Sequence, residues 1–243
     1  MFSFSSNYKL KDIIPANYID IHNHLLPGID DGAPNVADSN KMIAAIKKMN
    51  IFKAIATPHT YIGQWDNTPK TIENAFKLAI KDKENLLFLK GFASEYMLTL
   101  DLIDLAKKER LLCLHENYLL IEIQTRNFQL NLYEMLFELQ LLNYKLILAH
   151  PERYVYLCDD LTKLKKLKSF GIFFQLNLLS LTGYYGATIT KNAIQLLDNN
   201  LYDFSGTDIH NEQQVDNLRN SRIQYPNKKK LIELLEKNYI FNN

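Results

Sequence analysis

Hydrophobic positions along this chain alternate between two patterns. Short apolar runs with an extended character are followed by polar segments in which apolar residues recur at helical spacing. Strand–helix alternation over 243 residues predicts an α/β protein in which helices cover a parallel sheet. Seven runs are candidate strands: 18–24, 54–59, 86–95, 118–123, 146–150, 172–177 and 202–208.

The polar segments between the runs carry helix signals. Thr68 and Pro69 have the order of an N-cap and a first helical residue. Asp160 is placed to cap a leucine-bearing helix that Gly171 ends, and a last helix is expected after Pro226. Apolar stripes predict further helices around 42–49, 72–80, 132–142 and 189–197.

Seven strand–helix units can close into a barrel, and a doubly wound open sheet is the alternative. A barrel predicts polar chemistry at the carboxyl ends of its strands, where the following loops converge. The sequence agrees with this, because polar side chains gather at the ends of the runs. Of the six histidines, only His115 lies away from such an end. The side chains at or just past these ends are His22, His24, Asp30, Asp31, His59, Glu95, Glu122, His150, Asp208 and His210.

The spacing of these residues has a physical meaning. Side chains alternate faces along a strand, so His22 and His24 should point the same way, as should Asp208 and His210 if the strand extends that far. A donor set of imidazoles and carboxylates without thiolates favours zinc, manganese or iron. Its size exceeds the needs of one tetrahedral zinc, so two or three ions are expected, with Glu95 as a candidate bridge. A lone histidine at a strand end is more often structural, and only the grouping favours a metal site.

Composition narrows the class of protein. Hydrophobic residues make up 47% and charged residues 23%, as in globular domains, and the net charge of +1 creates no field for nucleic acid. Cys113 and Cys158 lack the spacing of a zinc knuckle or a disulfide framework, so both are expected as reduced thiols. The N-terminus lacks the apolar core of a signal peptide, and no run is long enough to span a bilayer. We therefore expect one cytosolic domain over 1–243, and its oligomeric state is left open.

Several segments resemble one known family. They are DIHNHLLPGIDDGA (20–33), ATPH (56–59), SEY (94–96), LAHPERY (148–154), QLNLLSLTGYYG (175–186) and GTDIHN (206–211). In this order they resemble the PHP (polymerase and histidinol phosphatase) superfamily. They look most like its branch of bacterial, manganese-dependent protein-tyrosine phosphatases linked to capsule and exopolysaccharide assembly.

The resemblance implies a distorted seven-stranded (β/α)7 TIM-like barrel of the PHP type. It implies a trinuclear site that holds manganese, with iron, cobalt or zinc as substitutes. When the family's ligand positions are carried over to this chain, Asp31 rather than Asp30 is the implied ligand, because Asp31 precedes Gly32. The implied ligands are His22, His24, Asp31, His59, Glu95, Glu122, His150, Asp208 and His210.

Two further residues receive catalytic roles from the resemblance. Arg153 would hold phosphate oxygens and stabilise charge in the transition state, the alternative being a surface ion pair with Glu152. Asp30 would assist as a neighbouring acid. Tyr184 and Tyr185 either wall the entrance or pack the loop.

The chain departs from the family pattern near the substrate. Thr60 and Tyr61 follow ATPH where a basic residue or histidine is common, and IQTRNF follows Glu122 in place of a proline-containing stretch. Val215 occupies the position of a second arginine, and Arg219 is the nearest one. These changes leave the implied metal ligands intact. They do not define which residues surround the phosphate, and hence which substrate binds.

Three functions follow from these observations. The first is hydrolysis of phosphotyrosine on a protein, expected to be a bacterial tyrosine kinase, by a metal-activated water. The second is a small-molecule phosphoesterase such as a histidinol-phosphate phosphatase, which would have a narrow, capped pocket. The third is a metal-stabilised scaffold that binds a kinase without turnover. A nucleic-acid phosphodiesterase is not favoured, because no basic stripe is visible.

Overall fold

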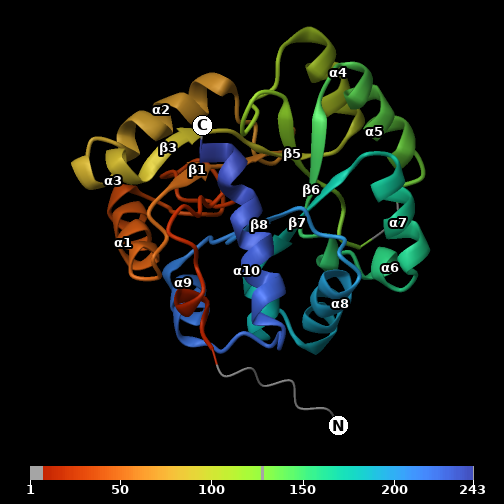
Figure 1. The fold of residues 1–243 in the computed structure, drawn as a ribbon. Helices are drawn as coiled ribbons and strands as arrows, with labels where there is room; N and C mark the ends of the chain where they lie inside the picture. Colours follow the sequence, from red (N-terminus) through yellow and green to blue (C-terminus); the bar gives the residue numbers. More distant parts are fainter. Residues whose placement is uncertain (1–7, 127–128, 243) are drawn as a thin grey trace.

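The computed structural model describes residues 8–126 and 129–242. Residues 1–7, which begin the segment tested above for a signal peptide, lie outside the described part. A curled parallel sheet occupies the centre, and helices surround it (Figure 1). Six strands pair in the order β2-β4-β5-β6-β7-β8, and β1 pairs with β3. The strands are β1 Ala54–Ala56, β2 His59–Thr60, β3 Leu89–Phe92, β4 Glu95–Met97, β5 Tyr118–Glu122, β6 Lys145–Ala149, β7 Phe173–Asn177 and β8 Phe204–Gly206.

Two predicted strands differ from the observed ones. The run 54–59 is divided into β1 and β2. The prediction of a strand over 86–95 was wrong for its first three residues. Those three residues end helix α3 (Lys83–Phe88), which Asp82 caps by accepting a hydrogen bond from the backbone N–H of Glu84. The remainder of that run is divided into β3 and β4, so that Glu95 begins a strand instead of ending one.

The run 18–24 closes the curl of the sheet without forming a regular strand. On one side, Asp20 makes a parallel bridge to Ala54, and the N–H of Ile55 donates to the carbonyl of Asp20. On the other side, the N–H of Asp208 donates to the carbonyl of His22. The α/β fold with a curled parallel sheet is therefore confirmed. The count of seven strands is not confirmed, because this run holds only an isolated bridge.

The helices follow most of the sequence signals. Thr68 caps α2, Asp160 caps α7, and Gly171 follows α7 in a left-handed conformation with φ +79°. Leu142 was wrongly placed on an apolar stripe, because it follows α5 and is 37% exposed. The helices, besides α3, are α1 Val36–Lys47, α2 Pro69–Ala79, α4 Leu100–Lys108, α5 Leu132–Leu141, α6 Val155–Cys158, α7 Leu161–Ser169, α8 Ala187–Asp198, α9 Glu212–Asn220 and α10 Lys228–Glu236. Short 3-10 turns are Leu10–Asp12, Pro151–Arg153, Leu178–Thr182 and Lys237–Asn242.

Two apolar clusters form the core, and the smaller one underlies the polar strand ends. Alternation along β5 puts Leu120, a member of this cluster, on the same face as Glu122. The ring of Phe241, near the C-terminus, packs 4.9 Å from the ring of Phe204 and 5.6 Å from that of Tyr118. The polar ends of the strands thus rest on an apolar floor that the C-terminal segment completes.

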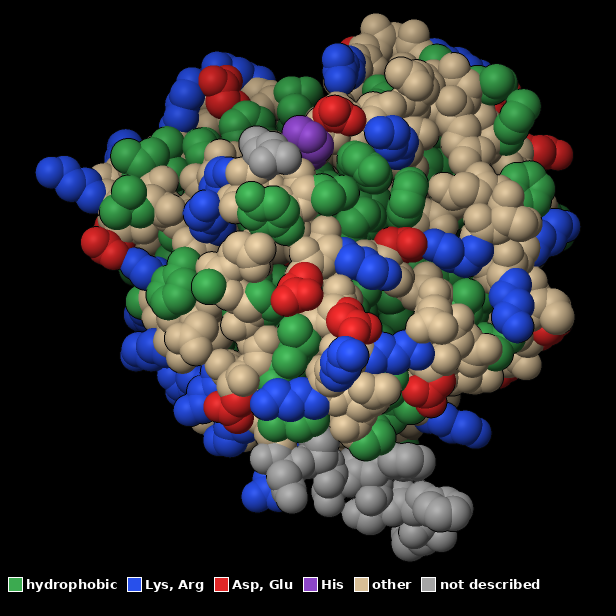
Figure 2. Space-filling view, viewed as in Figure 1, with side chains coloured by type: hydrophobic (Ala, Val, Ile, Leu, Met, Phe, Trp, Pro, Cys, Tyr) green, Lys and Arg blue, Asp and Glu red, His purple; other side chains and the backbone are tan. Residues whose placement is uncertain are grey.

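The surface adds little to this picture. On the face that Figure 2 shows, basic and acidic side chains are interspersed. Within the described residues, no helix combines the length and apolar character that a membrane crossing requires. Both cysteines are free thiols, as expected; Cys158 is buried and Cys113 is partly buried.

Candidate metal centre

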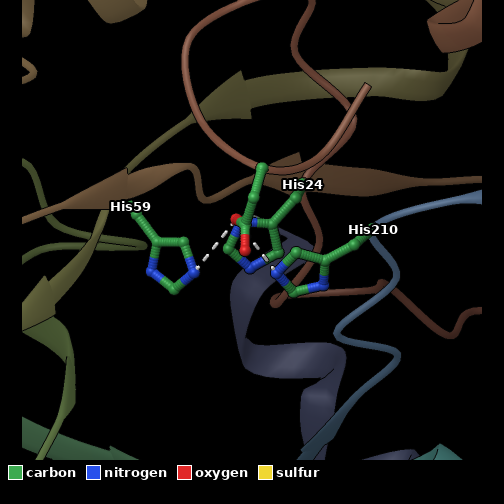
Figure 3. A group of neighbouring side chains, drawn as sticks. His24, His59 and His210 are labelled. Carbon is green, nitrogen blue, oxygen red and sulfur yellow. Dashed lines mark ion pairs between the residues drawn. The ribbon is translucent and has the colours of Figure 1, made fainter. Parts of the chain in front are cut away.

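The structure brings all of the implied ligands together at the carboxyl-end side of the sheet. Figure 3 shows His24, His59 and His210 converging from separate parts of the chain. In each of three overlapping groups, the donor atoms lie within 4.8 Å of one another. The groups are His24, Asp31, His59 and His210; His22, His24, Glu95 and Asp208; and His59, Glu95 and Glu122. His150 joins them through its Nε2, 3.1 Å from Glu95 Oε1.

Glu95 occupies the centre of the cluster. Its Oε2 lies 3.1 Å from Nε2 of His22, 3.4 Å from Nε2 of His24 and 3.2 Å from Nδ1 of His59. This buried oxygen has no hydrogen-bond partner of acceptable geometry, and neither has His59 Nδ1. Buried polar atoms without partners are costly, and a cation between them would satisfy both. The donor set therefore fits a metal ion, and Glu95 as a bridge stays a prediction.

The two adjacent aspartates have different surroundings. Asp31 is half exposed, and its Oδ1 lies 3.5 Å from Nε2 of both His59 and His210. The side chain of Asp30 is buried and accepts hydrogen bonds from His24 Nδ1 at 2.8 Å and from the backbone N–H groups of Gly32 and His59. Asp31 as ligand stays a prediction, which these contacts support, while Asp30 fixes the orientation of His24.

The histidines and carboxylates compensate each other's charge. Burial lowers the pKa of His22, but Glu95 and Asp208 outweigh this and raise the pKa to about 9. Burial raises the pKa of Glu95 and of Asp208, yet the surrounding histidines hold both pKa values well below the usual range. Burial also raises the pKa of Asp30, but His24 brings the pKa down to about 2. The carboxylates of Glu95, Asp208 and Asp30 are thus held in their ionised form.

Local backbone geometry directs several of these side chains. His59 and Glu95 are direct partners in the register of β2 and β4, so they lie side by side. His150 and Asp208 adopt left-handed conformations, with φ +35° and +51°, which are strained for residues with a Cβ. The premise that strand geometry continues to Asp208 was wrong, since β8 ends at Gly206. Asp208 reaches the cluster through this turn.

Sequence reasoning missed a residue that holds His22 in place. Gln175, in the middle of β7, is fully buried, and its Oε1 lies 2.8 Å from Nδ1 of His22. A hydrogen bond at Nδ1 leaves Nε2 free to bind a metal. The available signal was a polar residue inside an apolar strand, which must find a partner when buried.

Replacing Gln175 by alanine is expected to weaken metal affinity about 10- to 100-fold, because His22 loses the partner that fixes its tautomer. Metal titration of the chelator-treated variant measures this. Gln140→Ala is the matched control, since Gln140 lies on α5 and its partly exposed side chain donates a hydrogen bond to the carbonyl of Phe170. Unchanged affinity in Gln175→Ala would show that the hydrogen bond does not orient the ligand.

Arg153 lies at the edge of the cluster. Its Nη1 donates to Asp208 Oδ2 at 2.9 Å, and its guanidinium lies 5.0 Å from the ring centre of Tyr185. The alternative ion pair with Glu152 was wrong. Glu152 is buried and accepts hydrogen bonds from the backbone N–H of Asn177 and from two side-chain hydroxyls, those of Ser180 and Tyr202. Arg153 is thus held by Asp208 and by the ring of Tyr185, and not by Glu152.

A hollow of about 590 Å³ adjoins the cluster, and both His59 and Glu122 form part of its wall. Arg153, Arg126 and Trp65 also line it. Arg219, in contrast, pairs with Asp216 on α9. His115 lies apart from the cluster, 3.9 Å from Glu116, as expected.

The curled parallel sheet and the histidine–carboxylate cluster define an α/β protein with a candidate metal centre. The family described as "Capsular polysaccharide synthesis, CpsB/CapC" matches residues 18–240, and the chain belongs to this family. The match confirms the resemblance that the sequence motifs carry.

Characterised relatives agree with this assignment. The chain is 33% identical over 197 residues to the tyrosine-protein phosphatase YwqE of Bacillus subtilis, covering 79% of this chain and 77% of the relative. It is 24% identical over 203 residues to the tyrosine-protein phosphatase CpsB of Streptococcus pneumoniae, covering 79% and 83%. A structure from work on YwqE and CpsB, described there as unique metal-dependent tyrosine phosphatases, matches with a TM-score of 0.74. It is 29% identical and covers 90% of this chain and 86% of the other.

Proposed function

We propose that this protein is a metal-dependent protein-tyrosine phosphatase. The observation that carries the proposal is the position of Glu95 Oε2 among three imidazole nitrogens, with Arg153 at the edge of the same cluster. The names of the relatives support the choice of phosphotyrosine as substrate. A kinase as the physiological partner and a cytosolic location stay predictions.

The implied ligand set is kept in full, with two or three manganese ions and with iron, cobalt or zinc as alternatives. Ions held there would polarise the phosphoryl group and lower the pKa of water. Arg153 binds phosphoryl oxygens and stabilises their charge. Asp30 orients His24 instead of acting as an acid, in line with its contacts. We also propose that the seven hydrophobic runs act as the seven members of one barrel.

Phosphate release by chelator-stripped protein, with and without manganese, tests the proposal. The substrates are a phosphotyrosyl peptide and histidinol phosphate. We expect manganese-dependent release from the peptide, because the hollow beside the cluster is bordered, among the residues that the structure describes, by exposed ones such as Gln124 and Arg126. Release from histidinol phosphate alone would keep the metal chemistry and replace the substrate.

A pair of histidine variants completes this experiment. His150→Ala should abolish manganese-dependent release, whereas His115→Ala should leave it intact, since His115 lies outside the cluster. A protein that binds metal but releases phosphate from neither substrate would act as a scaffold. In that case His150→Ala would still bind the partner.

A further inference from the structure

A short hairpin holds the protein's single tryptophan against the candidate centre. The Trp65 ring stacks on the imidazole of His59, with centroids 4.6 Å apart and 11° between the planes. Two backbone hydrogen bonds join Tyr61 and Trp65, of 3.0 Å and 2.8 Å. Gly63 lies between them with φ +89°, a conformation that a side chain would strain. The backbone thus fixes the place of the indole ring.

The base of this hairpin is anchored to the centre as well. The side-chain amide of Asn67 donates to the carbonyl oxygens of Ile29 and His59, at 2.8 Å each. The N–H of Gly63 donates to Asp66 Oδ1 at 2.7 Å. A ring held in this way loses little freedom when a ligand packs against it, so its contacts contribute fully to binding.

Trp65 also faces the hollow beside the centre. It lines this space together with Arg153 and Arg126, and it is only partly buried. Arg126 is exposed and forms no ion pair among the residues that the structure describes. The hollow therefore combines an aromatic wall with guanidinium groups next to the metal-binding donors.

We infer that this hollow is the binding pocket for the aryl group of a phosphomonoester, and that Trp65 is the residue that selects aryl over alkyl esters. The inference rests on the proposed function and specifies how the phosphatase would distinguish aryl from alkyl phosphate esters. An indole face makes offset or edge contacts with a phenyl ring that an alkyl chain cannot match. Phosphotyrosine therefore gains contacts in this pocket that phosphoserine lacks. The competing interpretation is that Trp65 only covers His59.

Fluorescence tests the pocket without turnover, because Trp65 is the only tryptophan. Zinc-loaded protein is titrated with phenylphosphonate and with methylphosphonate, which are not hydrolysed. We expect a saturable change in emission with phenylphosphonate and at least about fivefold weaker binding of methylphosphonate. Equal affinities for the two ligands, or no saturable change with phenylphosphonate, would overturn the inference.

Kinetics test the selection itself. The ratio of kcat/KM for a phosphotyrosyl peptide to that for the matching phosphoseryl peptide should fall about five- to tenfold in Trp65→Ala, through KM for the phosphotyrosyl peptide. Trp65→Phe should keep most of the preference. Arg126→Ala should raise KM for both peptides alike, because a guanidinium does not distinguish the two esters.

The metal content of each variant is measured in parallel, because Trp65 touches a candidate ligand. If Trp65→Ala keeps its metal and its kcat/KM ratio for the two peptides is unchanged, Trp65 does not select the ester and only covers His59. If the wild-type protein with metal releases no phosphate from either peptide, the proposed function fails. The phosphonate titration then still decides whether the hollow binds an aryl group.

Discussion

Replacing Glu95 by glutamine is expected to lower manganese-dependent phosphate release about a thousandfold, which corresponds to several kcal/mol of lost transition-state stabilisation. Glu95 reaches His22, His24, His59 and His150 through its two oxygens. The amide keeps the size of the side chain but removes the negative charge, and its NH2 group cannot bind a cation. A centre with a neutral group at its middle holds its ions weakly and in the wrong places.

Initial rates with a phosphotyrosyl peptide, together with metal content, measure this effect. Glu116→Gln is the matched control, because Glu116 is exposed and its carboxylate lies 3.9 Å from His115 and 3.5 Å from Lys145. A Glu95→Gln protein that keeps both its ions and its rate would remove Glu95 from the proposed ligand set.

Replacing Gly206 by alanine is expected to destabilise the protein by about 3 kcal/mol, at the upper end of the cost of overpacking a core. A Cβ at this position would lie 2.5 Å from the Cβ of His22 and 2.9 Å from Nε2 of Gln175. Both neighbours belong to the buried interior and hold each other through a hydrogen bond. The clash would therefore displace a proposed ligand as well as the end of β8.

Urea unfolding of the metal-free protein measures the change, because bound metal would add its own contribution to stability. Gly91→Ala, in β3, is the control, since a Cβ there meets no atom within 4 Å. We expect that variant to unfold at about the wild-type urea concentration. A similar midpoint for Gly206→Ala would mean that His22 can move aside without cost.

The sequence predicted the clustering of the candidate donors better than it predicted the bounds of the strands that carry them. The positions of His22, His59 and Glu95 at or near the ends of predicted runs were sufficient to expect one cluster, because parallel strands end at a common edge. The boundaries were less certain. The residues 86–88 are as apolar as a strand, and only the Asp82 cap favours the helix that forms. Tertiary packing decides such short apolar segments.

The surroundings of the ligands were mostly hidden from the sequence. No local pattern predicts that Gln175 meets His22, because 153 positions separate them. The same holds for Trp65, whose stacking on His59 depends on a hairpin that Gly63 makes possible. The departures from the family pattern fell in this region, where IQTRNF supplies Arg126 to the wall of the hollow. Contacts between distant segments require the folded chain.

The closing role of the run 18–24 has a consequence for how the protein is made. This run hydrogen-bonds both to residues near β1 and to Asp208, so the first and the last proposed ligands meet only across nearly the whole chain. During synthesis at about 10 residues per second, the chain carries His22 and His24 for roughly 20 s before His210 has been added. Until then the nascent polypeptide lacks His210, so the proposed set of ligands is incomplete. The complete set of proposed ligands is therefore available only when most of the chain has been made.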